Sequence, residues 1–451
     1  MMLFIYFAIT LLACYYYNSR QYVKFIIASF AICSDGFGIL SPPDPLKTVD
    51  LFSVIILYGF VRGTLSINCK GDRIGKILLW LLLYEFIIGA ATILTRHETP
   101  VYSVMVLRFE IYYFIYFLFK KIPNTAIEKA FKYLYIITVV TGLLYYLQFV
   151  GVVGILQISS VENVSSYTFY DRVQNKPLLT SIMLFYSLFY KGKLKYRWLS
   201  VFFFLGMIVL SQNRSEIIAV LASIGIAFIV VNDRKLWNKY VVLIVVSILT
   251  FMPIMSYRFS SEGSVGTGAF TEMQSSFDII SRNKTEGYGS GNDVINTEGT
   301  LVYRMLVLKE RLDYLSESFL RTIFGIGTVH EYSPSGRSLA FFYGNIDTNK
   351  DVVYYIDTTD IAFLSHVIRY GLVYLGLFVY FVCLASVMLK KCKDEIFSLC
   401  ALLLLISYLL RCFTGDFFTG VDNMFFLFLI LSQIHKFSIR YENTEKNIPM
   451  A

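Results

Sequence analysis

Long apolar runs separated by short polar connections dominate the sequence. A helix needs about 20 apolar residues to cross the hydrocarbon core of a bilayer, and inside that core it satisfies its own backbone hydrogen bonds. The pattern therefore predicts an all-α polytopic membrane protein with about 12–13 transmembrane helices. We expect these helices at residues 2–17, 22–40, 50–68, 77–95, 101–119, 131–152, 177–190, 198–211, 214–231, 239–255, 371–389, 396–412 and 422–435.

One stretch of roughly a hundred residues, from Met255 to Asp360, interrupts this pattern. It is rich in Gly, Ser, Asn, Asp and Arg, and it contains more acidic than basic residues. We expect it to be a large extracytoplasmic loop that holds much of the functional site. The chain then divides into residues 1–255 with ten helices, a loop at 256–370, and residues 371–451 with three helices and a cytoplasmic tail.

The loop itself has two parts. Residues 259–300 are rich in Ser, Gly, Asn and Thr, which predicts a flexible segment. Between 301 and 320 apolar residues recur at three- and four-residue spacing, which predicts an amphipathic helix that stops at a Gly-Ile-Gly turn. The apolar positions are Val302, Met305, Leu308, Leu312, Leu315 and Phe319.

A second glycine divides the apolar run that follows the loop. Residues 360–389 are too many for one ordinary span, and Gly371 lies between the polar first part and the apolar second part. We therefore predict a short helix at the outer surface before Gly371 and a membrane span after it.

The basic residues give the orientation. Only 16% of the residues are charged, against about 25% in soluble domains, and the net charge of +8 arises mostly in short connections that alternate along the chain. Basic connections mark the cytoplasmic side. The N-terminus is then outside and the C-terminus cytoplasmic, and a nucleic-acid partner is not expected.

The seven cysteines avoid the long loop, and none has CxxC spacing. This pattern predicts neither a disulfide framework nor a metal site. No other feature of the sequence requires a metal or a cofactor.

Several charged residues lie within or beside expected spans. Arg214 opens the helix at 214–231; it either extends to the lipid head groups or offers a guanidinium fork to a diphosphate. Glu85, Arg108 and Glu110 lie inside expected helices, where ionisable residues suggest function. An ion pair between Arg108 and Glu85 or Glu110 is an equally good structural interpretation.

Asp360 ends the loop. It follows Thr359 where the cap of the next helix belongs, so a capping role and a catalytic role are both open. An Asp with an ordinary pKa of about 3.9 is a weak base for a hydroxyl, and a base at this position would require burial.

Three stretches in this order resemble the bacterial O-antigen polymerase and O-antigen ligase superfamily. Ser211-Gln212-Asn213-Arg214-Ser215-Glu216 is similar to the family's Ser-x-x-Arg corner. Tyr303-Arg304 through Gly325-Ile326-Gly327 is similar to its loop helix, which begins with Arg and ends in Gly-x-Gly. Asp360 through Gly371 and onward to Leu377 is similar to the segment that leads into its next span.

The resemblance implies a metal-independent membrane glycosyltransferase in the bacterial cytoplasmic (inner) membrane. The implied enzyme joins undecaprenyl-diphosphate-linked repeat units into O-antigen, capsular or exopolysaccharide. A flippase and a chain-length regulator are the implied protein partners. The implied catalytic residues are Asp360, Arg214 and Arg304, and the further arginines for the diphosphate or glycan are Arg172, Arg337, Arg369 and Arg411.

One departure favours a polymerase. In the ligases the position eleven residues before the glycine that corresponds to Gly371 is typically His. Here that position is Asp360, and His366 lies half a helix away in register. The alternative within the class is a ligase that transfers glycan to a lipid or protein acceptor. A lipid-linked oligosaccharide transporter is the alternative outside it, although the sequence has no evident internal repeat.

Overall fold

The described part of the chain is mostly helical. The computed structural model describes residues 2–40, 47–65, 67–151, 161–162, 172–173, 176–190, 192, 194–211, 213–231, 241, 245, 269–282, 300–339, 341–347, 352–356, 361–412, 414–415, 417–418 and 420–446. Within these ranges the strands form only two short antiparallel pairs, β1 (Val161–Glu162) with β2 (Arg172–Val173) and β3 (Asn345–Asp347) with β4 (Val352–Tyr354).

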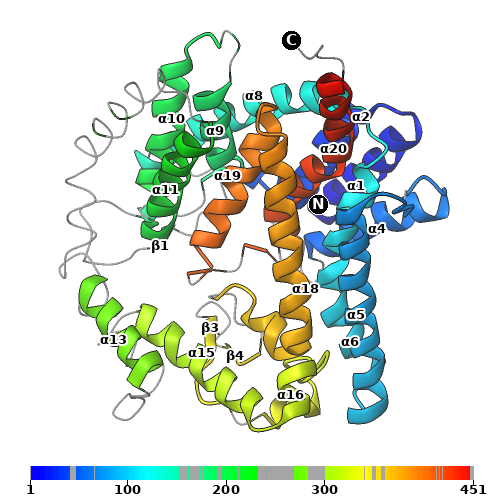
Figure 1. The fold of residues 1–451 in the computed structure, drawn as a ribbon, viewed down its shortest axis with the longest axis vertical. Coiled ribbons are helices and arrows are strands. Elements are labelled where there is room, and N and C mark those ends of the chain that lie inside the picture. Colours follow the sequence, from blue (N-terminus) through cyan, green and yellow to red (C-terminus); the bar gives the residue numbers. More distant parts are fainter. Residues whose placement is uncertain are drawn as a thin grey trace.

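Two groups of helices make up the fold (Figure 1). Long helices, among them α5 and α18, stand side by side, and α13, α15 and α16 of the polar loop lie across one end of them. The helices of the first half are α1 (Met2–Asn18), α2 (Tyr22–Cys33), α3 (Asp35–Gly38), α4 (Thr48–Val61), α5 (Arg73–Arg96), α6 (Pro100–Leu107), η1 (Arg108–Tyr113), α7 (Phe114–Phe119), α8 (Asn124–Phe149), α9 (Thr180–Phe189), α10 (Arg197–Leu210) and α11 (Arg214–Val231). Those of the second half are α13 (Ala269–Arg282), α15 (Thr300–Ser316), α16 (Phe319–Phe324), α17 (Pro334–Arg337), α18 (Leu364–Lys391), α19 (Ile396–Leu410) and α20 (Val421–Lys446).

Four helical segments are long and apolar enough to cross a membrane. They are Arg73–Arg96, Pro100–Phe119, Asn124–Phe149 and Leu364–Lys391, and they overlap predicted spans. The remaining apolar helices are shorter and lie at Leu3–Asn18, Tyr22–Cys33, Thr48–Val61, Thr180–Phe189, Arg197–Leu210, Ile396–Leu410 and Val421–Ile434. The predicted span at 239–255 falls outside the described residues except for Val241 and Val245.

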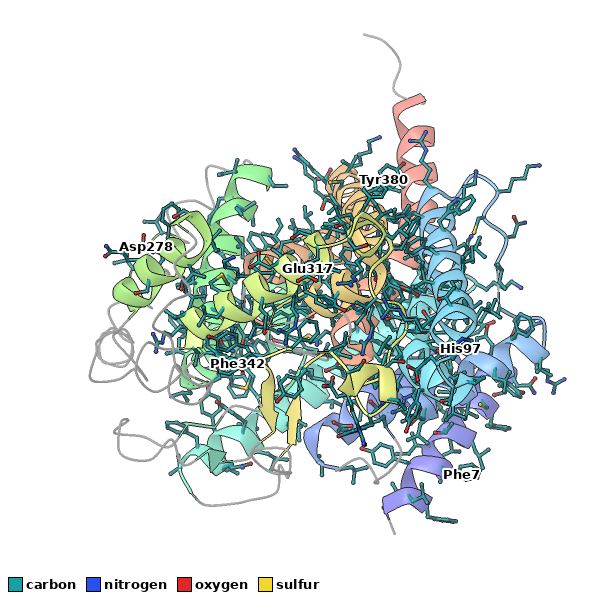
Figure 2. All side chains as sticks on the ribbon, turned by 90° about the horizontal axis from the view of Figure 1, so that it is seen from below. Phe7, His97, Asp278, Glu317, Phe342 and Tyr380 are labelled. Atoms are coloured by element: carbon teal, nitrogen blue, oxygen red, sulfur yellow. The ribbon has the colours of Figure 1, made fainter. Side chains whose placement is uncertain are left out.

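Large apolar side chains cover much of the outer surface of the long helices. Trp80, Phe86 and Ile87 of α5 are more than half exposed, and Figure 2 shows Phe7 of α1 projecting from the edge of the molecule. Exposed apolar surfaces of this extent mark contact with lipid or with another protein.

The polar stretch contains more helix than its composition suggests. The segment predicted to be flexible, 259–300, includes the 14-residue helix α13. The prediction was wrong there because packing stabilises the helix: Ile279 is fully buried against Val302 and Met305 of α15, and helices of this length depend on such tertiary contacts. Asp278 of α13 and Glu317 after α15 are labelled in Figure 2.

The amphipathic helix predicted at 301–320 is confirmed as α15, but its buried face differs from the prediction. Val302, Met305 and Leu315 are buried as expected, whereas Leu312 and Phe319 are 45% and 79% exposed. The buried face of α15 therefore differs from the predicted apolar stripe, and it includes an arginine.

That arginine is Arg311, which is 1% exposed. Its Nε and Nη2 donate to the carbonyl oxygen of Tyr355 at 3.2 and 2.8 Å, and its guanidinium lies 3.9 Å from the ring centre of Phe341. The carboxylate of Glu310 and the carbonyl of Tyr343 complete its partners. Arg311 is thus a structural residue that joins α15 to the chain around β3 and β4.

The predicted break at Gly371 is confirmed, and its cause is a backbone crossing. Gly371 has φ +70° inside α18, and Gly325 has φ +73° after α16. A Cβ on Gly371 would lie 2.3 Å from the carbonyl oxygen of Ile323, and one on Gly325 would lie 2.3 Å from that of Arg369. Only glycine allows two chains to pass this closely, so the Gly-Ile-Gly turn is a packing element.

The same turn is anchored to the long helices. Ile326 N–H donates to the carbonyl of Ile368 at 2.8 Å. Thr328 N–H donates to Thr92 Oγ1 of α5 at 3.0 Å, and its hydroxyl donates to Ser103 Oγ of α6 at 2.9 Å. The short helix predicted before Gly371 is the first part of α18, and its residues from Val367 to Tyr370 are buried among these elements.

Candidate functional site

A cavity of about 340 Å³ lies among the ends of several helices. The elements that meet there are the end of α2 with α3, the middle of α8, the residues before α9, the start of α11, the end of α19 and the start of α20. Its charged lining residues are Asp35, Lys176, Glu216, Arg411 and Asp422.

Glu216 is the carboxylate that lies between the two basic residues of the cavity wall, Lys176 and Arg411. It is 3% exposed on the first turn of α11. Lys176 Nζ lies 2.5 Å from its Oε2, Ser181 Oγ donates to its Oε1 at 3.0 Å, and Arg411 Nη1 lies 3.8 Å from Oε1. One carboxylate therefore holds two cations in place where both are largely removed from water.

Burial dominates the electrostatics of Lys176. Desolvation lowers the pKa of its ammonium group below the ordinary value, and Arg411 lowers it further, while the attraction of Glu216 acts in the opposite direction. Lys176 precedes Pro177 and α9, so its backbone position is fixed by the start of that helix.

Arg411, one of the predicted arginines, follows the last residue of α19 and is 8% exposed. Its guanidinium carbon lies 3.7 Å from the ring centre of Phe417. Its Nε is buried and has no hydrogen-bond partner within the described part of the chain. A buried guanidinium with an unused donor in a cavity is suited to an oxygen-rich ligand.

The corner that contains Arg214 borders the same cavity. Asn213 lines the cavity, and its Oδ1 accepts hydrogen bonds from Glu216 N–H at 3.3 Å and from Ser215 Oγ at 2.8 Å. This is an N-cap, which explains why the polar corner begins a helix here. Arg214 is half-buried next to Asn213 but does not itself line the cavity.

The other predicted arginines lie elsewhere. Arg304 is half-buried on α15, and Arg369 is buried at the Gly371 crossing, where its carbonyl accepts from Gly327 N–H at 2.8 Å. Arg337 is exposed at the end of α17, and Arg172 pairs with Glu162 in the register of β1 and β2. Among the predicted arginines whose side chains the structure describes, Arg411 lines this cavity and Arg214 lies at the corner that borders it.

Asp360, the predicted base, lies outside the described residues. The chain that follows it is described: Ala362 N–H donates to the carbonyl of Cys412 at 2.8 Å, and Ile361 is buried against α15. The start of the α18 segment therefore joins the end of α19, beside Arg411, to the loop helix that contains Arg304.

A second group of buried ionisable residues lies within the long helices. His366 Nε2 is 3.2 Å from both carboxylate oxygens of Glu110, and the imidazole stacks on Tyr374 with ring centres 5.1 Å apart. The hydroxyls of Tyr374 and Tyr113 are hydrogen-bonded at 2.7 Å. Glu85 is fully buried close to Glu110.

The suggested ion pair between Arg108 and Glu85 or Glu110 is wrong. Arg108 Nη1 instead contacts both oxygens of Asp50 at 3.1 and 3.2 Å. Asp50 also accepts from Lys47 N–H at the start of α4, so a helix cap places the carboxylate where Arg108 reaches it. Helical spacing along one segment does not reveal a partner from another helix.

Lys176, Glu216 and Asp35 are functional-site candidates that the sequence did not predict. A signal was present for the first two: Lys176 is the last charged residue before an apolar run, and Glu216 follows Arg214 by two positions. Both were expected at the same side of the membrane. Within the described ranges no group of three or more His, Cys, Asp or Glu residues is placed to hold a metal ion.

Comparison with known proteins adds no relative. No protein-family model matches the chain, and no curated protein matches it.

Proposed function

We propose that this protein is a polytopic glycosyltransferase of the bacterial cytoplasmic membrane that polymerises undecaprenyl-diphosphate-linked oligosaccharide repeat units at the outer face. The observation that supports this best is the cavity where Lys176 and Arg411 converge on Glu216, beside the Arg214 corner. In this proposal the N-terminus is outside, the C-terminus is cytoplasmic, and the polar loop covers the outer ends of the helices.

The proposed reaction needs positive charge where the leaving group departs. A hydroxyl oxygen of the acceptor unit forms a bond with the anomeric carbon of the donor glycan. The bond between that carbon and the diphosphate oxygen breaks, the electron pair leaves with the undecaprenyl diphosphate, and the hydroxyl proton passes to a base. In this proposal Arg411 and Lys176 in the cavity wall, with Arg214 at the adjacent corner, stabilise the leaving diphosphate, since preorganised charge is often the largest catalytic term.

Asp360 remains the proposed base, and Arg304 the proposed contact from the loop helix. The link between Ala362 and Cys412 supports this assignment, because it holds the chain directly after Asp360 against the end of α19. Arg172, Arg337 and Arg369 are proposed to contribute less than Arg411, the arginine that lines the cavity within the described residues.

A polymerase is favoured over a ligase by the state of His366. The ligase-like position eleven residues before Gly371 carries Asp360, and His366 is 6% exposed and paired with Glu110. A histidine held in this way is not available to an acceptor in the cavity. Partners in this pathway are then a flippase and a chain-length regulator.

A transporter of lipid-linked oligosaccharide is the second candidate. The buried Glu85, Glu110 and His366 and the breaks at η1 and Gly371 favour it, because broken helices and intramembrane charges are common in transporters. The two functions differ in product: a transporter moves the repeat unit and forms no new glycosidic bond.

Polymer formation in a deletion strain tests the proposal. Cells without the chromosomal copy receive wild type, Arg411→Ala, Arg214→Ala or Arg304→Ala, and the chain-length ladder is compared at equal protein level in the membrane. We expect the three variants to lose the ladder. The matched control is Arg321→Ala on α16, whose side chain is 34% exposed, pairs with Glu317 and does not line the cavity. Wild-type ladders from Arg411→Ala and Arg214→Ala would refute the assignment.

A further inference from the structure

The wall of the cavity between α2 and residue 40 has an unusual backbone. Asp35, Gly36, Phe37 and Gly38 have φ values of +49°, +59°, +63° and +81°. Residues other than glycine avoid this region unless the surrounding structure holds them there. α3 is therefore a left-handed turn, and two of its four residues are not glycine.

Hydrogen bonds hold this turn in place. Ser34 Oγ accepts from Phe37 N–H at 3.2 Å and donates to the carbonyl of Phe30 at 2.6 Å. Gly38 N–H donates to the Ser34 carbonyl at 2.8 Å, and Tyr6 of α1 donates to the carbonyl of Leu40 at 3.1 Å. The turn is tied to α1 and α2, so the position of the Asp35 side chain is fixed.

The carboxylate of Asp35 differs from those of Glu216 and Asp422 in the cavity wall by its hydrogen bonding. Glu216 is occupied by Lys176 and Ser181, and Asp422 accepts from backbone N–H groups at the start of α20. Asp35 Oδ1 is buried and has no hydrogen-bond partner among the residues that the structure describes. An acceptor buried in this way is costly unless something donates to it.

A matching donor faces the same space. Arg411 is 8% exposed, lines the cavity and has a buried Nε without a hydrogen-bond partner in the described ranges. Asp35 and Arg411 therefore share a cavity whose wall is about half polar and half apolar, with Phe30, Phe37 and Leu134 among its apolar residues.

This combination describes a neutral polyhydroxylated ligand. A sugar ring offers hydroxyl donors, hydroxyl and ring oxygens that accept, and an apolar C–H face. The volume of about 340 Å³ is at the lower end of the roughly 300–1,000 Å³ range of ligand sites. A guanidinium has five N–H donors, so Arg411 has further donors for a diphosphate at the edge of the cavity.

We propose that the cavity binds one sugar unit of the acceptor glycan, with the Asp35 carboxylate accepting a hydrogen bond from a hydroxyl and the Arg411 guanidinium donating to a sugar oxygen. This inference rests on the proposed polymerase function and adds the acceptor subsite to it. Asp35 is a substrate-binding residue in this arrangement, held by the left-handed turn at the position where the hydroxyl must be oriented.

Binding of free sugars to the purified full-length protein in lipid nanodiscs tests this subsite. The probes are glucose, galactose, N-acetylglucosamine and rhamnose, detected by saturation-transfer NMR and titrated for affinity. We expect at least one of them to bind wild type and to bind Asp35→Asn at least tenfold more weakly. Asn tolerates the left-handed conformation as Asp does, so the turn is retained.

Two further variants make the test specific. Thr138 lines the cavity, and its hydroxyl donates to the carbonyl of Leu134 in its own helix, not to Asp35. Thr138→Phe therefore places a ring in the cavity and leaves Asp35 in the sequence. We expect it also to abolish sugar binding. Asp313→Asn removes an exposed carboxylate from α15 and should bind sugar as wild type does.

The outcomes separate this inference from the function on which it rests. Equal sugar affinity in wild type and Asp35→Asn, or no binding of any probe to wild type, would overturn the subsite. Sugar binding that depends on Asp35 in a protein that forms no polymer would leave the subsite intact and refute the polymerase. Normal polymer from Asp35→Asn with unchanged sugar binding would refute the subsite and leave the polymerase assignment intact.

Discussion

Two regions of the molecule bury ionisable side chains among apolar helices, and they differ in whether a cavity lies beside those side chains. At the cavity, Glu216 is saturated by cations, but Asp35 Oδ1 and Arg411 Nε have no hydrogen-bond partners in the described structure. At the Glu110–His366 centre, the imidazole meets both carboxylate oxygens and stacks on Tyr374.

The difference indicates which region binds a ligand. Buried charge occurs in both, so burial alone does not distinguish a site from a structural pair. Both regions contain buried polar atoms without a hydrogen-bond partner in the described structure, Glu85 Oε1 and Oε2 in the second. The cavity is lined by Asp35 and Arg411 of the first region, whereas Glu110 and His366 do not line it. We therefore interpret the cavity as the functional site and the Glu110–His366 pair as an internal link between η1 and α18.

The largest effect should follow from Glu216→Ala. It leaves Lys176 and Arg411 buried without their shared carboxylate, and breaking a buried ion pair from one side lowers the free energy of unfolding by about 3–5 kcal/mol. Denaturant unfolding of the purified protein in detergent measures this. Glu317→Ala, which removes an exposed partner of Arg321, is the control; equal small losses would contradict the network.

Gly371→Ala should come next. The added methyl meets the Ile323 carbonyl at 2.3 Å at a residue with φ +70°, and overpacking together with the left-handed conformation should lower the free energy of unfolding by about 2–4 kcal/mol. Gly376→Ala in the same helix meets nothing within 4 Å and should be neutral or slightly stabilising. The same unfolding assay compares the two, and equal stability would show that the crossing is not tight.

Glu110→Gln should have a smaller effect on stability and none on the site. The amide retains a hydrogen-bonding group for His366 but removes the charge, so we expect a loss of about 1–3 kcal/mol with polymer formation preserved. Unfolding and the chain-length ladder are measured on the same preparations. Loss of polymer at normal stability would assign a functional role to this centre and weaken the comparison.

Arg108→Ala should have the smallest effect. Its side chain and that of Asp50 are 24% and 21% exposed, so the pair is less buried than Glu110 with His366. We expect a loss of about 0.5–1.5 kcal/mol, the net contribution of an ordinary hydrogen bond. A loss beyond that range in the unfolding assay would mean that Arg108 holds η1 in place.

The sequence predicted most helices because their apolar runs are long and continuous. It also placed the break at Gly371 and the helix now seen as α15. It did not predict the face of α15, because the burial of Arg311 depends on the Tyr355 carbonyl, which lies 44 residues away. It missed α13 because the contacts of Ile279 with α15 are not visible in a polar segment.

The candidate site was predictable only in part. Arg214 and Arg411 were recognisable as arginines at helix ends on one side. The partner of Arg411 and the left-handed turn at Asp35 were not, because each depends on segments that are distant in sequence and meet only in the folded chain. The pairing of Arg108 with Asp50 instead of Glu110 has the same cause.

The most direct test compares Arg411→Ala with His366→Gln in the purified protein supplied with lipid-linked repeat unit. The initial rate of undecaprenyl diphosphate release is measured, together with the length of the glycan product. We predict that Arg411→Ala lowers the rate at least a hundredfold, while His366→Gln stays within a few-fold of wild type. A normal rate for Arg411→Ala and a lost rate for His366→Gln would contradict the assignment of the site to the cavity.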